Sequence, residues 1–342
     1  MSALKVAIVG CGLIGHKRAV ALDADCELIG SYDVSAEATQ RLADEHGGIA
    51  AGSLDELLAL GPDVVVVAVT HDQLTPVGVA VLEAGAHLLV EKPAGLSTNQ
   101  IAQLKAAAEA SGKLVKVGFN HRFHPGIMRA TELAHSGEFG EILHVRGRYG
   151  HGGRPGYDRE WRAEPARSGG GELIDQGMHL LDLTHWVLGD LPLHSALLRT
   201  QFWDTVVDDN AVLVLGEKDS RTAPWAMLHV TWTEWKNMFS LEIYCRTAKL
   251  QIDGLTRSYG PQTLRVYRMS EELGPPEVEE ITYPKDDPSW DAEWAHFADA
   301  IRTGKGNETL LGNLDDAAWA WARVQDAYEA GGYGDMRAQV GA

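Results

Sequence analysis

The chain opens with an apolar segment that gives way to a helical pattern of hydrophobic positions. Residues 4–9 hold five apolar side chains in six positions, as in a strand buried inside a sheet. Gly10, Gly12 and Gly15 follow with G-x-G-x-x-G spacing and open a helix over 13–22. This spacing allows a tight turn, lets a pyrophosphate approach the backbone and brings the helix close to the strand. The order of strand, glycines and helix therefore predicts a dinucleotide site with the phosphates at the helix N-terminus.

The apolar pattern then alternates between strands and helices up to residue 117. Strands are predicted at 26–32, 63–69, 87–90 and 114–117, with helices between them. Asp33 ends the second strand, where a carboxylate accepts the ribose hydroxyls and repels a 2′-phosphate, so NAD is favoured over NADP. These elements predict an α/β fold, a Rossmann doubly wound parallel sheet. A glycine-rich turn in some other α/β fold is the alternative.

The second half of the chain has a different pattern, with successive strands and few helices between them. Strands are predicted at 141–149, 197–203, 210–215, 225–233, 239–244 and 264–267, turns at 216–219 and 247–249, and helices at 125–135, 174–188, 290–302 and 314–330. Such a run predicts an α+β domain with a large open, mostly antiparallel sheet. We place the NAD(P)-binding domain at residues 1–121 and a substrate-binding and oligomerisation domain at 122–342.

Composition narrows the class of protein. The 342 residues suit two domains, and 45% hydrophobic residues suffice for two cores. A formal net charge of −18 argues against a nucleic-acid partner. The three cysteines are far apart, as expected in a reduced cytoplasm, and no stretch resembles a signal peptide or a membrane span. We expect a cytoplasmic protein.

Lys92 is the first candidate catalytic residue. It follows the strand at 87–90, at the sheet edge where the nicotinamide should lie, and Pro93 stiffens its turn. An ammonium there could stabilise a developing alkoxide. A solvated surface lysine is the alternative.

Asp175 and His179 form the second candidate pair. Their spacing of four places them on one face of the helix predicted at 174–188, where the carboxylate could orient the imidazole as a general base. By spacing alone, a surface Asp–His pair is the favoured interpretation; the glycines at 169–171 and the family resemblance given below favour the catalytic one. Asp175, His179, Asp182 and His185 do not lie on one face of the helix, so they cannot all bind one ion. No other set of residues has the spacing of metal ligands, and no metal site is expected.

The long polar segment at 150–171 carries Trp161, Arg162 and Arg167. Long loops in compact domains are usually functional or disordered, and we interpret this one as a substrate-facing lid. Its cations could meet an anionic group of the substrate or pin the loop to an acidic surface. Trp225, Trp232, Trp235 and Phe239 suggest that a second subunit covers the free face of the sheet, although Trp232 and Trp235 could also line the substrate pocket.

The chain resembles the Gfo/Idh/MocA family in a series of motifs that occur in the same order. These are the motifs named so far, Glu91-Lys92-Pro93, the run from Gly118 to Phe123 and the run from Gly169 to His179. The family is the glucose–fructose oxidoreductase and inositol dehydrogenase group. The resemblance implies an NAD(P)-dependent dehydrogenase of sugars, sugar nucleotides or cyclic polyols, whose second-domain sheet often mediates oligomerisation. We expect NAD rather than NADP, and a homo-oligomer, dimer or tetramer. The chain departs from the family at Val69-Thr70-His71 and at Leu74, where Thr-Pro-Asn and a histidine are common.

The expected site residues follow from these motifs together with the resemblance. The cofactor-binding set is Gly10, Gly12, Leu13, Ile14, Gly15, Asp33, Thr70, His71, Gln73, Glu91, Lys92, Asn120 and Arg122. The substrate-binding set is Lys92, His121, Arg122, His151, Arg154, Trp161, Arg162, Asp175, His179 and Trp235, and the catalytic residues are Lys92, Asp175 and His179.

These residues predict an NAD(P)-dependent dehydrogenase acting on a secondary alcohol of a sugar, sugar nucleotide or cyclic polyol. His179 would remove the hydroxyl proton, and Lys92 would stabilise the alkoxide over the same pyridine ring. Two alternatives are an NAD-retaining glycosidase that works by oxidation and elimination, and a non-catalytic NAD-binding sensor. Lys92 and His179 are both present, which argues against the sensor.

Overall fold

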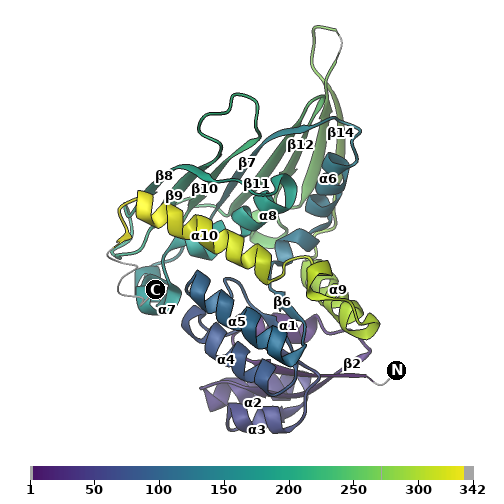
Figure 1. Ribbon diagram of the computed structural model, residues 1–342, viewed down its shortest axis with the longest axis vertical. Helices are drawn as coiled ribbons and strands as arrows, with labels where there is room; N and C mark the ends of the chain where they lie inside the picture. Colours follow the sequence, from purple (N-terminus) through teal and green to yellow (C-terminus); the bar gives the residue numbers. More distant parts are fainter. Residues whose placement is uncertain (1–2, 271, 335–342) are drawn as a thin grey trace. The chain divides into compact units, whose positions relative to one another are not determined.

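A computed structural model describes residues 3–270 and 272–334 of the chain (Figure 1). The chain forms two compact units. The first runs from the N-terminus to Asn120 and also includes Trp290–Ala318. The second comprises His121–Ser289 and continues from Trp319. None of the helices in the described part of the chain is long and apolar enough to span a membrane.

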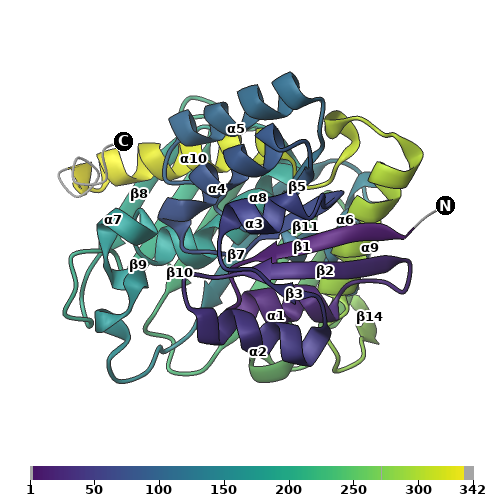
Figure 2. The same ribbon diagram turned by 90° about the horizontal axis from the view of Figure 1, so that it is seen from below.

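The first unit is built on a six-stranded sheet in the order β3-β2-β1-β4-β5-β6, in which all neighbours run parallel. This is the strand order of a Rossmann fold and confirms the predicted doubly wound sheet. Figure 2 shows its strands between flanking helices. The strands are β1 Leu4–Val9, β2 Cys26–Tyr32, β3 Ile49–Ala50, β4 Val64–Val67, β5 His87–Val90 and β6 Val115–Val117; the helices are α1 Leu13–Val20, α2 Ala36–His46, α3 Leu54–Ala59, α4 His71–Glu83 and α5 Thr98–Ser111.

The core of this unit explains why the apolar runs are continuous. All four valines of β4 have no exposed surface, as expected for a parallel strand covered by helices on both faces. Helix α9 (Ser289–Thr303) contributes Trp294 and Phe297 to the same apolar cluster as Val6 and Ile8.

Residues 290–318 pack with the first unit, whereas the sequence-based division placed all of 122–342 in the second domain. Asn307 Oδ1 accepts a hydrogen bond of 2.8 Å from Val115 N, and Lys116 forms a buried ion pair of 3.1 Å with Glu293. The amphipathic pattern of α9 shows that it has an apolar face but not which core receives that face.

The second unit contains an eight-stranded sheet in the order β14-β13-β12-β11-β7-β10-β9-β8. Only the β7–β10 pair among the described strands of this sheet is parallel, so the predicted mostly antiparallel sheet is confirmed. The strands are β7 Ile142–Gly150, β8 Leu193–Arg199, β9 Asn210–Gly216, β10 Trp225–Thr231, β11 Met238–Cys245, β12 Ala248–Asp253, β13 Thr263–Arg268 and β14 Glu277–Thr282.

Three strands differ from the prediction. Strand β8 covers 193–199 rather than 197–203. Strand β12 was not among the predicted strands, and it begins at Ala248, inside the turn predicted at 247–249. Strand β14 was not predicted at all. It is an edge strand that is exposed at nearly every position, so it lacks the apolar alternation from which a strand is recognised.

Helices α6 (Pro125–His135) and α8 (Met178–Leu188) pack on one face of this sheet. The single helix predicted at 174–188 is in fact a π-helical turn, Leu173–Gly177, followed by α8. The predicted helix at 314–330 is α10, Leu314–Ala330. The polar segment at 150–171 contains short helical turns at Tyr157–Arg159, Trp161–Ala163 and Pro165–Ser168 (α7).

The aromatic residues expected on the free face of the sheet divide into two groups. Trp225 and Trp235 are 39% and 63% exposed, but Trp232 and Phe239 are 1% and 2% exposed. The last two are therefore already buried by their own chain and are not available to a second subunit.

Candidate active site

The glycine turn after β1 has the geometry that a pyrophosphate requires. A Cβ on Gly10 would lie 2.3 Å from Ala68 O, and one on Gly15 would lie 2.0 Å from Gly10 O, so strand, turn and helix are too close for any side chain. At Gly12, by contrast, a Cβ would meet no described atom within 4 Å. Among the described residues no side chain caps α1 at Gly12, so its first N–H groups are left to a ligand. The turn fits NAD.

Asp33 is tied to this turn. Its Oδ2 accepts a hydrogen bond of 2.8 Å from Cys11 N, and its Oδ1 accepts one of 2.9 Å from Ser35 N. Each carboxylate oxygen can accept more than one hydrogen bond, so Asp33 can hold the turn and still accept from ribose hydroxyls.

The other expected cofactor residues of the first unit lie at the carboxyl ends of the parallel strands. Leu13 is 74% exposed at the start of α1, next to Ile14. After β4, Thr70 is the N-cap of α4, and its hydroxyl donates to Asp72 Oδ1 at 2.6 Å. Gln73 Nε2 donates to the other oxygen of Asp72 at 2.8 Å, and the His71 side chain is buried.

Lys92 is partly buried directly after β5, and the Lys92–Pro93 peptide bond is cis. Its neighbour Glu91 accepts hydrogen bonds from the buried Arg18, with Nε at 2.8 Å and Nη2 at 2.5 Å from Oε1. Arg18 also donates to Glu293 at 2.6 Å. Glu91 therefore anchors the segment that carries Lys92, a structural role that the sequence did not predict.

Asn120, which is 5% exposed, ends the first unit, and Arg122 lies just inside the second. The Arg122 guanidinium donates to both oxygens of Asp182, at 2.9 and 2.6 Å, and the pair is almost fully buried. Arg122 thus braces α8 from the segment before α6. A cofactor or substrate contact of Arg122 stays a prediction.

His179 lies in the first turn of α8 and is 6% exposed. Its ring stacks on that of His121, with centroids 3.7 Å apart and planes at 21°. His121 Nε2 is 3.1 Å from the Tyr149 hydroxyl. Burial raises the pKa of Tyr149 well above its ordinary value, so its phenol stays protonated at neutral pH and can donate to His121.

Sequence reasoning missed two tyrosines: Tyr149, which contacts His121, and Tyr259, which packs against Tyr149. The rings of Tyr149 and Tyr259 are 5.4 Å apart, and the Tyr259 hydroxyl accepts a hydrogen bond of 3.0 Å from Gln176 Nε2. Burial raises the pKa of Tyr259 to about 12. The alternating pattern of β7 could have placed Tyr149 on the buried face of that strand. No signal in the sequence predicts that Tyr259 packs against Tyr149.

Asp175 lies in the π-helical turn before α8 and pairs with Arg162 of the 150–171 segment at 3.2 Å. The nearby carboxylate raises the pKa of Arg162, and its guanidinium stacks over Trp161 at 4.7 Å. Arg154 of the same segment pairs with Glu160 at 2.5 Å. The cations expected to meet the substrate are thus held by carboxylates of this unit, and the orienting role of Asp175 for His179 stays a prediction.

His151 offers a ring nitrogen within 4.8 Å of carboxylate oxygens of Glu172 and Asp175. Its Nδ1 accepts a hydrogen bond of 2.9 Å from Gly153 N, and burial lowers its pKa. Arg162 pairs with Asp175, one of these two carboxylates. Trp235 is 63% exposed and packs edge-on against Phe202 at 4.7 Å.

The parallel sheet with its open glycine turn and acidic strand end defines an NAD-binding Rossmann protein. The comparisons agree, because the family model described as "Oxidoreductase family, NAD-binding Rossmann fold" matches residues 4–119. The model of the GFO/IDH/MocA C-terminal domain matches residues 127–251. The chain belongs to the GFO/IDH/MocA oxidoreductase family, as the motifs predicted.

Several of the relatives to which the chain is similar are named as sugar or inositol dehydrogenases. The chain is 32% identical to D-glucoside 3-dehydrogenase of Escherichia coli over 194 residues, 55% of each chain. It is 26% identical to inositol 2-dehydrogenase 2 of Saccharopolyspora erythraea over 237 residues, 62% of this chain and 65% of that one. The matches thus span roughly half to two thirds of these curated relatives. A crystal structure of GenD2 from gentamicin A biosynthesis in complex with NAD has a TM-score of 0.81 at 26% identity and covers 98% of this chain and 95% of that one.

Proposed function

We propose that the protein is an NAD-dependent dehydrogenase that transfers hydride between the nicotinamide and a secondary alcohol of a sugar, sugar nucleotide or cyclic polyol. The observation that carries the proposal is the buried His179, stacked on His121 in a chain whose other unit has an open NAD-type glycine turn. The dehydrogenases to which the chain is similar support this class of reaction.

The chemistry divides between cofactor and chain. When bound, NAD supplies the hydride acceptor. His179 removes the proton from the substrate hydroxyl, as a histidine near neutrality can, and returns it in the reverse reaction. The Lys92 ammonium stabilises the alkoxide that develops as the proton leaves. Asp175 acts as a positioning residue for His179 and, through Arg162, for the 150–171 segment.

The remaining expected contacts are part of this proposal. The adenosine and pyrophosphate half of NAD binds to the glycine turn, Leu13, Ile14 and Asp33. The nicotinamide half binds near Thr70, His71, Gln73, Asn120 and Arg122. The substrate binds to His121, His151, Arg154, Trp161, Arg162 and Trp235. The 150–171 segment acts as a lid over it. Three free thiols, Cys11, Cys26 and Cys245, suit the reducing cytoplasm that we propose as its compartment.

The test is to follow NADH absorbance with purified protein, NAD and a panel of glucosides, inositols and nucleotide sugars. Glucosides come first because the relative at 32% identity is named for oxidation at C3 of a glucoside. Saturable NADH formation with at least one substrate supports a dehydrogenase. Glycoside cleavage without net NADH would instead indicate the retaining glycosidase, and lack of NAD binding would exclude both.

We also propose that the protein is a homo-oligomer joined through the face of the eight-stranded sheet that lies opposite α6 and α8. That face carries an aromatic ladder, in which His144 of β7 stacks on Trp225 at 4.6 Å and on Tyr244 at 4.2 Å. Trp225 and Met227 of β10 are 39% and 36% exposed there. Large apolar side chains grouped on one sheet face are typical of a subunit interface.

A further inference from the structure

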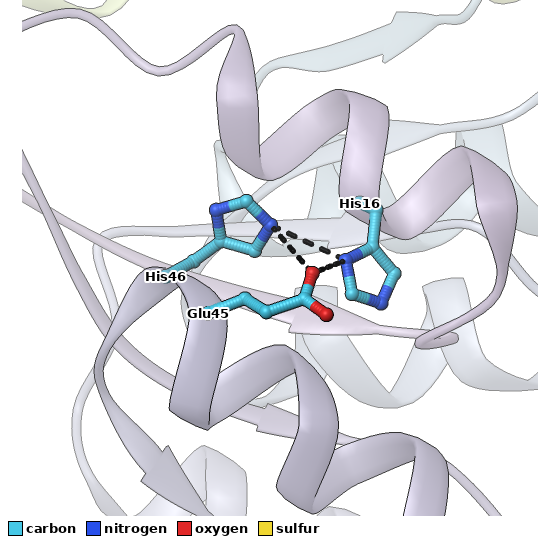
Figure 3. Close-up of side chains that lie close together, drawn as sticks. All are labelled: His16, Glu45 and His46. Carbon is cyan, nitrogen blue, oxygen red and sulfur yellow. Dashed lines mark hydrogen bonds and ion pairs between the residues drawn. The ribbon is translucent and has the colours of Figure 1, made fainter.

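The first unit contains a cluster of side chains that lies outside the expected cofactor-binding set. His16 of α1 faces Glu45 and His46 at the end of α2 (Figure 3). His16 Nδ1 is 3.0 Å from Glu45 Oε2 and 3.2 Å from His46 Nε2, and the last two atoms are 3.9 Å apart. We propose that these three side chains form a binding site for a divalent transition metal ion such as Zn²⁺, which joins α1 to α2.

The distances fit a zinc site. A point about 2.0 Å from all three atoms exists within this triangle, and Zn–N and Zn–O bonds are about 2.0–2.2 Å long. Two edges of the triangle, 3.0 and 3.2 Å, are close to the separation of about 3.3 Å between ligands in a tetrahedral zinc centre, and the third, between Glu45 and His46, is longer at 3.9 Å. Figure 3 shows the two ring nitrogens and the carboxylate oxygen facing one another. An ion slightly out of their plane would complete its coordination with water.

The cluster is less well satisfied without an ion. His16 Nδ1 carries at most one proton, which must serve contacts to both Glu45 and His46. The other ring nitrogen, Nε2, is buried and makes no hydrogen bond to a described residue, so the polar interactions of the ring run through Nδ1. A bound ion would accept a lone pair from each of the three atoms at once.

The local charge also favours a cation. Asp44, Glu45 and His46 lie in the last turn of α2, where the helix dipole places partial negative charge. Carboxylates are unfavourable at that end of a helix, and a divalent ion there offsets both effects. The imidazoles are about one fifth exposed and Glu45 about half, which leaves an entry path for the ion.

The donor set determines which ions the site should take. Two imidazole nitrogens and one carboxylate oxygen suit Zn²⁺, Ni²⁺ or Cu²⁺, whereas Mg²⁺ and Ca²⁺ prefer ligand sets made of oxygen. We therefore use Zn²⁺ as the probe and an excess of Mg²⁺ as the competitor that should have no effect.

The experiment is calorimetric titration of the metal-free, full-length protein with Zn²⁺, paired with thermal unfolding at increasing Zn²⁺. We expect one high-affinity ion per chain and a melting temperature that rises with Zn²⁺, because the ion binds the folded state. His46→Asn and Glu45→Gln should each weaken binding at least about tenfold and abolish the thermal shift. His194→Asn, which changes an exposed histidine of the second unit, is the matched control and should behave as wild type.

The outcomes are separable. Zn²⁺ binding of unchanged affinity in His46→Asn would place the ion elsewhere, for instance at His151 and its carboxylates, and would overturn the proposal. No binding by the wild-type protein would also overturn it. Circular dichroism spectra of the variants that match wild type show that a loss of binding does not reflect misfolding.

Discussion

At the residue scale, the candidate base is distinguished by its surroundings more than by its helix position. His179 is buried, stacks on His121 and is linked through that ring to Tyr149. An imidazole packed against a ring that is itself hydrogen-bonded is restricted in orientation, as a proton acceptor in catalysis must be. His185, six residues further along α8, is instead partly exposed and pairs with Asp190 at 3.6 Å.

We expect His179→Asn to lower kcat by about 10²–10⁴-fold while the Kd for NAD stays within about twofold, because a general base acts on the proton transfer and not on the cofactor. Steady-state NADH formation and NAD titration measure the two quantities. The matched control is His185→Asn on the same helix, which should keep wild-type kcat. A His179→Asn protein with wild-type turnover would show that His179 is not the base.

At the element scale, α6 begins at a histidine that its surroundings keep neutral. His124 is the N-cap of α6 and is 2% exposed, and its Nδ1 lies 3.9 Å from Asp287. Burial lowers the pKa of His124 to about 4, although Asp287 opposes that shift. The unfolded chain binds the proton near pH 6.5 and the folded chain does not, so stability is lost as the pH falls from about 6.5 to about 4.

Between pH 7 and pH 5 this histidine should lower the free energy of unfolding by about 2 kcal/mol. In urea unfolding at the two pH values, His124→Gln should therefore lose about that much less than wild type. His194→Gln, at an exposed position, should lose as much as wild type. Equal losses in wild type and His124→Gln would mean that His124 is protonated in the folded state as readily as in the unfolded chain.

At the scale of the whole molecule, the face of the eight-stranded sheet opposite α6 and α8 is the surface on which we expect a second subunit to bind. Its aromatic ladder is reinforced by cations, because Arg146 and Lys249 lie over the Tyr244 ring at 5.0 and 5.5 Å. Such a ladder stiffens the sheet and presents a flat apolar surface with a charged border, which resembles the core and rim of an interface.

We expect the wild-type protein to sediment as a dimer or tetramer at micromolar concentration and Trp225→Glu to shift it toward the monomer, since a buried, unpaired carboxylate would cost several kcal/mol at the interface. Analytical ultracentrifugation measures the masses. Val34→Glu changes a side chain of the first unit that is 94% exposed and should leave the mass unchanged. A monomeric wild-type protein would contradict this arrangement.

The sequence by itself determined the two-part architecture, the NAD-binding turn and the family. These depend on local chemistry: three glycines at fixed spacing, a carboxylate at a strand end, and apolar runs whose period distinguishes strand from helix. Strand β14 was not predicted, because an exposed edge strand carries no such period of apolar residues. The π-helical turn at 173–177 was not distinguished from an α-helix, because its residues also fit the 3.6-residue pattern.

Only the tertiary structure decided which distant residues meet. The return of α9 to the first unit, the bracing of Arg122 by Asp182 and the contact of Tyr149 with His121 each join residues far apart in the chain. The same holds for His16 with Glu45 and His46, which share no ligand spacing in the sequence. The physical reason is that local patterns report which face of an element is apolar or polar, whereas the packing of whole elements selects the partner that each face receives.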